Sequence, residues 1–595
     1  MLFSIFMCML TICYLILLEL SKNTWIGWAL AILSCILVIL LHSQQKIKSP
    51  LLAFLFFMVL VILYPITAPP KRYVPAVANK NPATTDILHL ADGDITGVYN
   101  ADHSVKVYAG IPYAAPPIGK LRFREPQPVT PWIGVRACDH FGSRAMQPQQ
   151  PVLIDSLSHV LGYHDYRIQW GDEYVEPMSE DCLYLNVFSP AKASKPLPVV
   201  LFIHGGSLTT GQSSYTEYRG ENLAKKGVIF VNFAYRLGVF GYYTAEDLKQ
   251  ESPHHTTGNY GLLDQIAALS WVYNNIASFG GDPKQITIAG ESAGASSAGA
   301  LCVSPLTKGL FRYCIAESSG IVAKKPFHTY RDYQTALSEG TKVRKEFHVK
   351  RSEELRVLPA KELLKTKSNQ SAMTLDGYAI VEPPYRTYEK GENHEQALLH
   401  GFNAKEADAF LMDKHATKEN YESLLAADLQ DYAAAMANVV PADTPARDQQ
   451  FIIDKGGEAK GALNKAYSAI WFSYSHYVWN RYMIQENRPS YEYYFTKTNT
   501  SLSNYHAGEL PYAYGNLWRH PGLYNKEDEA LSEIMQSYWV NFIKTGNPNG
   551  PSLPTWPLCQ SGEKKLLQLD TTIQPVDDPN EALYQVLDDY QRAQP

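Results

Sequence analysis

Cysteine is scarce in this chain of 595 residues, which contains only eight. Three of them, Cys8, Cys13 and Cys35, lie in apolar stretches near the N-terminus and leave an odd number for the rest of the chain. An odd number cannot pair completely, and no cysteine or histidine cluster has the spacing of a zinc site. We therefore expect neither a disulfide framework nor a bound metal ion.

Clustered positive charge and glycine-rich phosphate loops are also missing. The 53 lysines and arginines are scattered, and with 59 acidic residues the formal net charge is −6. A nucleic-acid surface requires a basic patch, and nucleotide cofactors are held by fingerprints such as G-x-G-x-x-G, which does not occur. We expect no nucleic-acid partner and no cofactor.

Three apolar runs do occur near the N-terminus, at residues 1–20, about 25–42 and 51–67. None carries a charge in its interior, and each approaches the length that a helix needs to cross a bilayer. Trp25, Trp28 and Tyr64 lie near the ends of the runs, and aromatic residues are enriched at membrane interfaces. The sequence therefore predicts three transmembrane helices within residues 1–67, and the bilayer as a partner.

A signal peptide is the alternative interpretation of the first run. Residues 1–20 lack a basic first segment and a small-residue cleavage site, and two further runs follow, which favours transmembrane helices. Residues 68–84 are rich in proline, which is typical of a semi-rigid extended linker. We predict a membrane segment at 1–67, a linker at 68–84 and a large domain at 85–595, in a multi-pass protein of a bacterial inner membrane.

The side of the membrane that holds the large domain stays open. Three spans place the N-terminus and the large domain on opposite faces. Basic residues flank the runs on both sides, and they are enriched in cytoplasmic segments, so their excess beside the large domain weakly favours the cytoplasm for it. They are Lys22, Lys71, Arg72 and Lys80 on the side of the large domain and Lys46 and Lys48 on the other.

From residue 86 onward, short apolar segments alternate with helical stretches. The apolar segments are residues 199–206, 227–236, 286–290, 311–320, 397–403 and 490–498. This alternation predicts an α/β fold with a mostly parallel sheet and helices on both faces. Ligands of such sheets bind beyond the C-terminal ends of the strands. Between about 321 and 490 the sequence is richer in charge and helix formers, which indicates helical excursions over an active site.

The sequence QITIAGESAG, residues 285–294, places Ser292 where an apolar strand ends and a run of small helix-forming residues begins. In such a G-x-S-x-G nucleophile elbow the turn is so sharp that the residues at −2 and +2, here Gly290 and Gly294, must lack a Cβ. A five-residue match arises by chance in roughly one of five chains of this length. The β-branched run at 286–289 before it supports Ser292 as a nucleophile.

Three longer segments resemble motifs of the type-B carboxylesterase/lipase family. They are FGGDPKQITIAGESAGA at 279–295, EDCLYLNV at 180–187 and NYGLLDQIAALSWV at 259–272, and further matches extend from GIPYA at 110–114 to YWVNFIKTGNPNG at 538–550. The resemblance implies the α/β-hydrolase fold and small-molecule ester substrates. The many secreted members of the family favour an extracellular side for the large domain, against the basic-residue count.

A serine hydroxyl needs a base to take its proton and an acid to hold that base in one tautomer. The segment GFNAKEADAF at 401–410 resembles the G-x-N-x-x-E of the family and implies Glu406 as the acid. The segment NYHAGELPYAYGN at 504–516 resembles its histidine segment and implies His506 as the base. The order serine, acid, histidine is that of α/β hydrolases. His204 is the competing histidine, for which we expect a structural role.

The segment HGGS at 204–207 follows a predicted strand, as an HGGG-type oxyanion loop does. The expected donors are the backbone N–H groups of Gly206, Ser207 and Ala293. Ser207 stands where the family usually has a third glycine. This replacement keeps the backbone N–H donor, and we expect its side chain to narrow the oxyanion hole. Glu291 and Ser319 match positions that the family keeps near the triad, and we expect them to support it.

Further expectations follow from the same resemblance. Trp170 is a candidate for lining the gorge, although core packing is the more common role. In secreted members the cysteine of EDCLYLN bridges to an upstream cysteine, whose position corresponds to Met146 here, so Cys182 is expected to be a reduced, buried thiol.

We predict a membrane-anchored serine hydrolase that cleaves carboxylic esters through an acyl-enzyme intermediate, with an inflection of kcat/KM near pH 6 to 7.5 if histidine is the base. One alternative is a non-catalytic, membrane-anchored adhesion or recognition protein, since relatives with this fold and without the chemistry exist. Those typically lack a triad member, and this chain has all three. Another alternative makes the membrane part a sensor, but uncharged spans offer no ion path.

Overall fold

The structure is a computed structural model that describes residues 2–21, 23–44, 47–69, 72–79, 81–148, 176–324, 329–445, 454–498, 504–517, 524–560 and 565–594. Trp170, Lys22, Lys46, Lys71 and Lys80 lie outside these residues. The chain divides into two compact units. Among the described residues, those within 1–74, together with 176 and 177, form the helical unit, and those within 75–148 and 178–595 form the large unit. The division at residue 74 falls inside the predicted linker.

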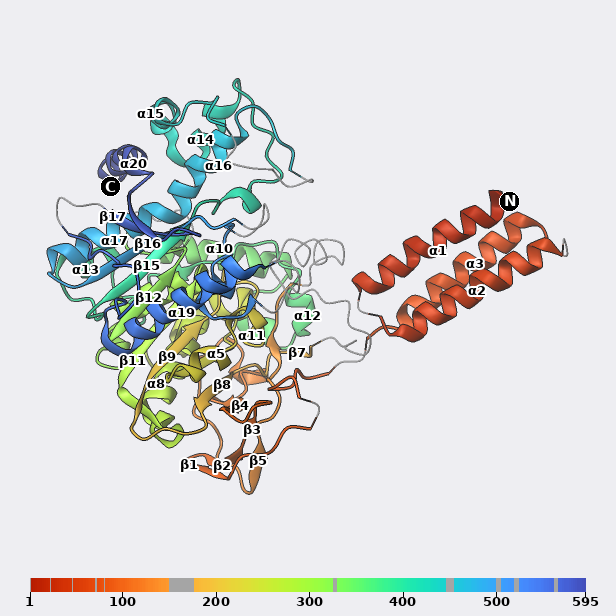
Figure 1. Ribbon diagram of the computed structural model, residues 1–595, viewed down its shortest axis with the longest axis horizontal. Helices are drawn as coiled ribbons and strands as arrows, with labels where there is room; N and C mark the ends of the chain where they lie inside the picture. Colours follow the sequence, from red (N-terminus) through yellow and green to blue (C-terminus); the bar gives the residue numbers. More distant parts are fainter. Residues whose placement is uncertain are drawn as a thin grey trace. The chain divides into compact units, whose positions relative to one another are not determined.

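Three apolar helices, α1 (Leu2–Leu20), α2 (Trp25–Ser43) and α3 (Ser49–Ile66), make up the described part of the helical unit apart from short connections (Figure 1). Leu18, Phe56 and Leu60 pack between the helices, whereas many other apolar side chains point outward and are exposed. The three predicted helices are therefore present, and each is long and apolar enough to cross a membrane.

Polar groups join the helices at one end of this bundle. Asn23, between α1 and α2, donates from Nδ2 to the carbonyl of Tyr64 at 2.7 Å and to Thr67 Oγ1 at 3.0 Å. The N–H of Thr24 donates to the carbonyl of Thr67 at 2.9 Å. Gly27 permits this approach, because a Cβ there would lie 2.6 Å from Thr67 Oγ1. The start of α2 therefore lies beside the end of α3.

Eleven strands form one sheet in the described part of the large unit (Figure 1). In spatial order they are β18 (Gln574–Asp577), β17 (Lys565–Leu569), β16 (Ser490–Phe495), β15 (Leu398–Asn403), β12 (Tyr313–Glu317), β11 (Gly281–Glu291), β9 (Leu197–Ile203), β10 (Ile229–Phe233), β8 (Tyr184–Pro190), β4 (Val105–Pro112) and β3 (Val98–Tyr99). From β10 to β17 all neighbours are parallel, and the remaining pairs are antiparallel. Each predicted apolar segment overlaps one of the parallel strands, which confirms the mostly parallel sheet.

Helices cover both faces of this sheet. On β12, Tyr313 packs its ring 5.7 Å from that of Phe542 on α19 (Lys526–Thr545), whereas the thiol of Cys314 contacts that of Cys302 on α9 (Ala293–Val303). Successive side chains of a strand point to opposite faces. The helices α19 and α9 therefore lie on opposite sides of the sheet.

The segment between β12 and β16 is mainly helical, as predicted. Between β12 and β15 lie α10 (Tyr333–Glu346), α11 (Ser352–Arg356), α12 (Ala360–Leu363) and α13 (Pro384–Glu389), and between β15 and β16 lie α14 (Tyr421–Leu429), α15 (Ala433–Val439), α16 (Lys460–Ser468) and α17 (Tyr474–Gln485). A π-helical turn, Ala469–Ser473, joins α16 to α17. The other long helices are α8 (Tyr260–Asn275) and α20 (Glu581–Ala593).

The strand register brings several loops to one edge of the sheet. Gly290 pairs with Ile203 of β9, and Glu291 pairs with Glu317 of β12. Glu317 pairs in turn with Gly401 of β15. The residues that follow β9, β11, β12 and β15 therefore emerge side by side, as expected for a site at the C-terminal ends of parallel strands.

Candidate active site

Ser292 lies in a strained turn between β11 and α9. Its φ of 55° and ψ of −124° are unfavourable for a residue with a side chain, and its N–H donates to the carbonyl of Glu317 at 2.8 Å. A Cβ on Gly290 would lie 2.4 Å from the carbonyl of Gly294, and one on Gly294 would lie 2.0 Å from that of Ile203. The turn therefore needs both glycines, and it presents Ser292 at the edge of the sheet.

Glu406 and His506 lie in direct contact although 100 residues separate them. Glu406 Oε2 accepts from His506 Nδ1 at 2.6 Å, and Glu406 Oε1 accepts from the N–H of Asn403 at 2.7 Å. A β-bridge between Lys405 and Tyr505 places the next residues of the two segments, Glu406 and His506, side by side. Asn403 Nδ2 also donates to the carbonyl of Tyr505 at 2.7 Å. Both carboxylate oxygens of Glu406 accept a hydrogen bond, so Glu406 is itself fixed and holds the imidazole of His506 in one orientation.

The other nitrogen of His506 points toward the turn of the serine. His506 Nε2 lies 3.2 Å from Glu291 Oε1, the carboxylate of the residue before Ser292. Among the described residues, no hydrogen bond joins Ser292 Oγ to His506. The structure therefore brings Glu406, His506 and Glu291 together, with Ser292 next along the chain.

The loop after β9 packs directly against this turn. A Cβ on Gly205 would lie 2.9 Å from Ser292 Cβ and 2.6 Å from Glu291 Oε2. Gly206 and Ser207 follow with φ of 105° and 54°. In the part of the chain that the structure describes, the N–H groups of Gly206, Ser207 and Ala293 donate to no protein acceptor. Three free donors thus lie in two segments that meet at Ser292.

His204 has a different environment from His506. Its Nδ1 hydrogen-bonds the carbonyl of Gly205 at 2.8 Å, its own carbonyl accepts from Tyr235 Oη at 2.8 Å, and its ring stacks on that of Tyr235. Burial lowers the pKa of His204 to about 4, which keeps the imidazole neutral. These contacts fix the loop that carries Gly206 and Ser207.

Further buried glutamates lie behind the histidine, and sequence reasoning missed them. Glu509 is fully buried and accepts from Ser318 Oγ and Tyr493 Oη, both at 3.2 Å, and from Asn403 Nδ2. Glu317 accepts from Tyr514 Oη at 2.9 Å and from Trp539 Nε1 at 3.0 Å. Glu509 lies three residues after His506, in the segment that resembles the histidine segment of the family. The motif could therefore have indicated Glu509 as a residue of the site.

Ser319 lies next to this network, and among the described residues its side chain hydrogen-bonds Ser296 rather than a triad residue. Its hydroxyl is 2.7 Å from that of Ser296 on α9. The neighbouring Ser318, with a φ of 58°, is the serine that reaches Glu509. Ser319 thus links the end of β12 to the helix that follows the nucleophile.

Burial and mutual repulsion shift the titration of this cluster. Burial raises the pKa of Glu291 to about 8 and that of Glu509 to about 7. Burial lowers the pKa of His506, but the charges of Glu291 and Glu406 outweigh this effect and raise it to about 9. Glu291 and His506 are in contact and share their protons. The pH at which the pair loses its last proton therefore lies above the ordinary pKa of histidine.

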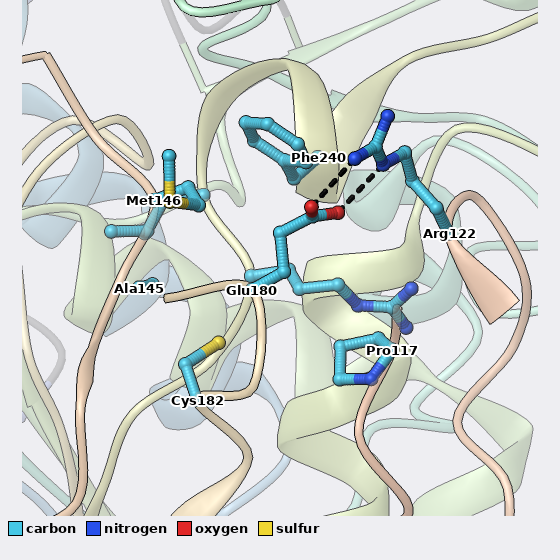
Figure 2. Close-up of a pocket in the computed structure, with 9 residues that line it drawn as sticks. Pro117, Arg122, Ala145, Met146, Glu180, Cys182 and Phe240 are labelled. Atoms are coloured by element: carbon cyan, nitrogen blue, oxygen red, sulfur yellow. Dashed lines mark hydrogen bonds and ion pairs between the residues drawn. The ribbon is translucent and has the colours of Figure 1, made fainter. Parts of the chain in front are cut away.

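A small pocket lies elsewhere in the large unit and contains no triad residue (Figure 2). Met146 and Cys182 both line it, beside the bidentate ion pair of Arg122 with Glu180, whose N–O distances are 2.6 Å. Cys182 is a free thiol, as are the other seven cysteines. The position expected to supply a disulfide partner in secreted relatives therefore holds a thioether here.

Within the described residues, no group of three histidine, cysteine or acidic side chains is arranged to hold a metal ion. The chemistry that the site offers is that of a strained serine, a histidine held by a carboxylate and free backbone donors.

Comparisons with known proteins show to which family the chain belongs. A profile described as the carboxylesterase family matches residues 84–586. The chain is 31% identical to carboxylesterase 5A of Homo sapiens over 521 residues, which cover 82% of this chain and 86% of the relative. It is 31% identical to the fumonisin B1 esterase of Sphingopyxis macrogoltabida over 497 residues, covering 79% and 84%. Because one of these relatives is human and the other bacterial, they do not indicate the organism from which this chain comes. A location in a bacterial inner membrane therefore stays a prediction.

Solved structures share the fold. A carboxylesterase of Geobacillus stearothermophilus has a TM-score of 0.70 at 27% identity, covering 84% of this chain and all of that one. A PNB esterase has a TM-score of 0.70 at 29% identity, covering 84% and 99%. The large unit therefore has the predicted α/β-hydrolase fold. With its profile match, its relatives and its fold in agreement, the chain belongs to the carboxylesterase family and is an ester hydrolase.

Proposed function

We propose that the large unit cleaves carboxylic esters through an acyl-enzyme intermediate, with Ser292 as nucleophile, His506 as base and Glu406 as its orienting acid. The observation that carries this proposal is the 2.6 Å hydrogen bond between Glu406 and His506, whose second ring nitrogen faces the strained turn of Ser292. A carboxylate on Nδ1 leaves Nε2 as the nitrogen that accepts a proton.

In the first half of the reaction, Ser292 Oγ attacks the ester carbonyl while its proton passes to His506 Nε2. The negative charge that develops on the carbonyl oxygen is stabilised by the free N–H groups of Gly206, Ser207 and Ala293. The C–O bond to the alcohol then breaks, and His506 returns its proton to the departing oxygen. In the second half, a water molecule activated by His506 hydrolyses the acyl-serine and restores the enzyme.

Glu291 has a supporting role in this proposal. Its carboxylate lies against His506 Nε2, the same nitrogen that must receive the proton of Ser292. Catalytic hydrogen bonds often tighten only when substrate binds. A small shift of the imidazole from Glu291 toward the neighbouring Ser292 would complete the relay, and the negative charge of Glu291 would stabilise the imidazolium that forms.

The pH profile tests His506 as the base. Because the base must be unprotonated, kcat/KM on a short ester should rise with pH and fall on acidification. The raised pKa of His506 places the inflection above pH 7, higher than the sequence alone suggested. Replacing Glu291 with glutamine removes a charge 3.2 Å from Nε2 and should lower the inflection by about one unit.

Glu353→Gln, which neutralises an exposed acid on α11, is the matched control and should leave the inflection in place. A flat profile from pH 5 to 10 under conditions in which chemistry limits the rate would contradict the role of His506. An inflection that Glu291→Gln leaves unchanged would contradict the role of Glu291.

A non-catalytic adhesion or recognition protein is the alternative that the sequence left open. Loss of catalysis in such proteins typically removes a triad member, and here the serine, the acid and the histidine are all present and lie at one edge of the sheet. The free N–H groups beside Ser292 are the donors that an oxyanion hole requires. These features favour the hydrolase.

We also propose that α1, α2 and α3 cross a bilayer and anchor the enzyme, with small-molecule esters as substrates. Each helix has the necessary length and apolar surface, and the polar side chains at the end of the bundle satisfy one another rather than facing outward. Trp25 and Tyr64 lie at this same end, which fits an interfacial position. Three spans place the N-terminus and the large unit on opposite faces.

An anchored chain should stay in the membrane pellet after an alkaline carbonate wash. In sealed vesicles, protease should remove only one of two terminal tags, because the termini lie on opposite sides. Deleting residues 2–20 leaves two spans and should put both tags on the same side. Release by carbonate, or equal cleavage of both tags on the full chain, would contradict three spans.

A further inference from the structure

Two buried histidines that the proposed mechanism does not use meet inside the large unit. His400 lies on β15, and His476 lies on α17, which packs against β15 and β16 (Figure 1). Neither residue has any exposed surface, and their Nδ1 atoms are 3.0 Å apart. His400 Nε2 hydrogen-bonds Ser490 Oγ on β16 at 3.0 Å, whereas His476 Nε2 has no partner among the described residues. The pair therefore forms a direct polar contact between a central strand and a helix that covers it.

The distance between the two Nδ1 atoms restricts the protonation of the pair. A hydrogen bond between two imidazole nitrogens needs a proton on one nitrogen and a lone pair on the other. Two neutral rings meet this condition. One added proton can occupy an outer nitrogen and leave the bond intact, but it buries a positive charge away from solvent. A second added proton sets two N–H groups face to face, so the contact can then no longer form.

The groups beside His400 do not stabilise a charged imidazole. In the register of the sheet, its neighbours are Ala316 on β12 and Glu492 on β16. Glu492 Oε2 accepts from Asn480 Nδ2 of α17 at 2.7 Å. Burial and the charge of Asp578 raise the pKa of Glu492 well above its ordinary value, which keeps this carboxyl neutral. Glu492 therefore offers no negative charge that would hold a proton on His400.

Aromatic rings and thiols also lie around the pair. Each histidine has an aromatic ring centroid 6.4 Å away, that of Trp479 for the histidine on β15 and that of Phe402 for the histidine on α17. Trp479 Nε1 donates to Glu395 Oε1 at 3.0 Å, so this carboxylate faces the indole rather than the imidazoles. The thiols of Cys314 on β12 and of Cys559 beside β16 stay neutral, because burial raises their pKa. These surroundings favour the neutral form of both rings.

The same surroundings set the sign of the pH dependence. Burial lowers the pKa of His476 to about 3, and burial together with the neighbouring His476 lowers the pKa of His400 well below its ordinary value. Once the contact opens and water reaches the rings, both return toward the ordinary histidine pKa of about 6.5. The stability that the neutral pair contributes is therefore complete above about pH 6.5 and is lost progressively as the pH falls toward 3.

We propose that the contact between His400 and His476 is an acid-sensitive latch, which holds α17 against β15 at neutral pH and releases it on acidification. The strand β15 ends at Asn403, whose N–H donates to Glu406 Oε1 at 2.7 Å. Opening of the latch therefore also loosens the loop that carries the acid of the proposed triad. This effect is separate from the titration of His506, which lies above pH 7 and requires no movement of β15.

Hydrogen exchange of the full chain in detergent tests the latch, with peptides of β15 and α17 compared between pH 7.5 and pH 4.5. Each rate is divided by the intrinsic exchange rate at the same pH. Every proton taken up on opening multiplies the opening constant by up to about 10 for each pH unit below about 6.5, so protection of both elements in the wild type should fall about 100-fold or more. His476→Asn takes up one proton fewer, and its amide oxygen can accept from His400 Nδ1 in either charge state. Its loss of protection should be at least about 10-fold smaller.

His348→Asn is the matched control, because His348 is an exposed histidine after α10 whose φ of 56° suits asparagine. It should lose protection in β15 and α17 as the wild type does. Each variant is compared with itself at pH 7.5, so a loss of stability at neutral pH cancels, and His400→Asn gives a second measurement with the same expectation as His476→Asn. The latch is wrong if the wild type loses less than about 10-fold, or if both latch variants lose as much as the wild type. Exchange is measured without substrate, so the result does not depend on the proposed ester hydrolysis.

Discussion

Ser292→Ala is expected to lower kcat on p-nitrophenyl acetate about 10⁴- to 10⁶-fold, with KM changed by less than about threefold. The substitution removes the only atom that forms the covalent bond, while the N–H of residue 292 can still donate to Glu317 and hold the turn. The free donors at Gly206, Ser207 and Ala293 remain, so residual catalysis above the rate in water should persist.

The measurement is steady-state kinetics with thermal unfolding recorded on the same samples. Ser270→Ala is a matched control, because Ser270 is a partly buried serine on α8 whose hydroxyl, within the described part of the chain, bonds only the carbonyl of Ile266. It should keep wild-type activity. A folded Ser292→Ala variant that retains a tenth of the wild-type rate would show that another residue is the nucleophile.

Glu406→Gln is expected to lower kcat about 10³- to 10⁴-fold with little change in unfolding temperature. A glutamine can keep the hydrogen bond from the N–H of Asn403 through its carbonyl oxygen. Its amide nitrogen would then face His506 Nδ1, which would have to accept rather than donate. This favours the tautomer with the proton on Nε2, and that nitrogen could no longer take the proton of Ser292.

The control for this variant is Glu395→Gln, since Glu395 is also fully buried and accepts from Tyr388 Oη at 2.7 Å and Trp479 Nε1 at 3.0 Å. Loss of a buried negative charge there should alter stability more than kcat. Near-normal turnover by Glu406→Gln, or an equal loss of turnover in both variants, would remove Glu406 from the proposed triad.

The chain order and local sequence determined much of the site. Gly290 and Gly294 are needed because a Cβ at either position would collide with nearby backbone atoms. A serine between two glycines at the end of a strand could therefore be recognised as a nucleophile elbow from the sequence alone. The apolar runs likewise predicted the helices α1 to α3 and the parallel strands, because helix and strand formation follow from hydrophobic patterns of a few to some twenty residues. The resemblance of GFNAKE and NYHAGE to segments of the family then indicated the acid and the base.

The tertiary structure decided what depends on groups distant in the chain. Only the pairing of Lys405 with Tyr505 brings Glu406 to His506, and only the register of β11 with β12 brings Glu317 beneath Ser292. The upward shift of the His506 pKa arises in the same way, because it depends on which charges surround the imidazole in space. A sequence pattern records neighbours along the chain, whereas electrostatic energy and burial depend on distances set by the whole fold.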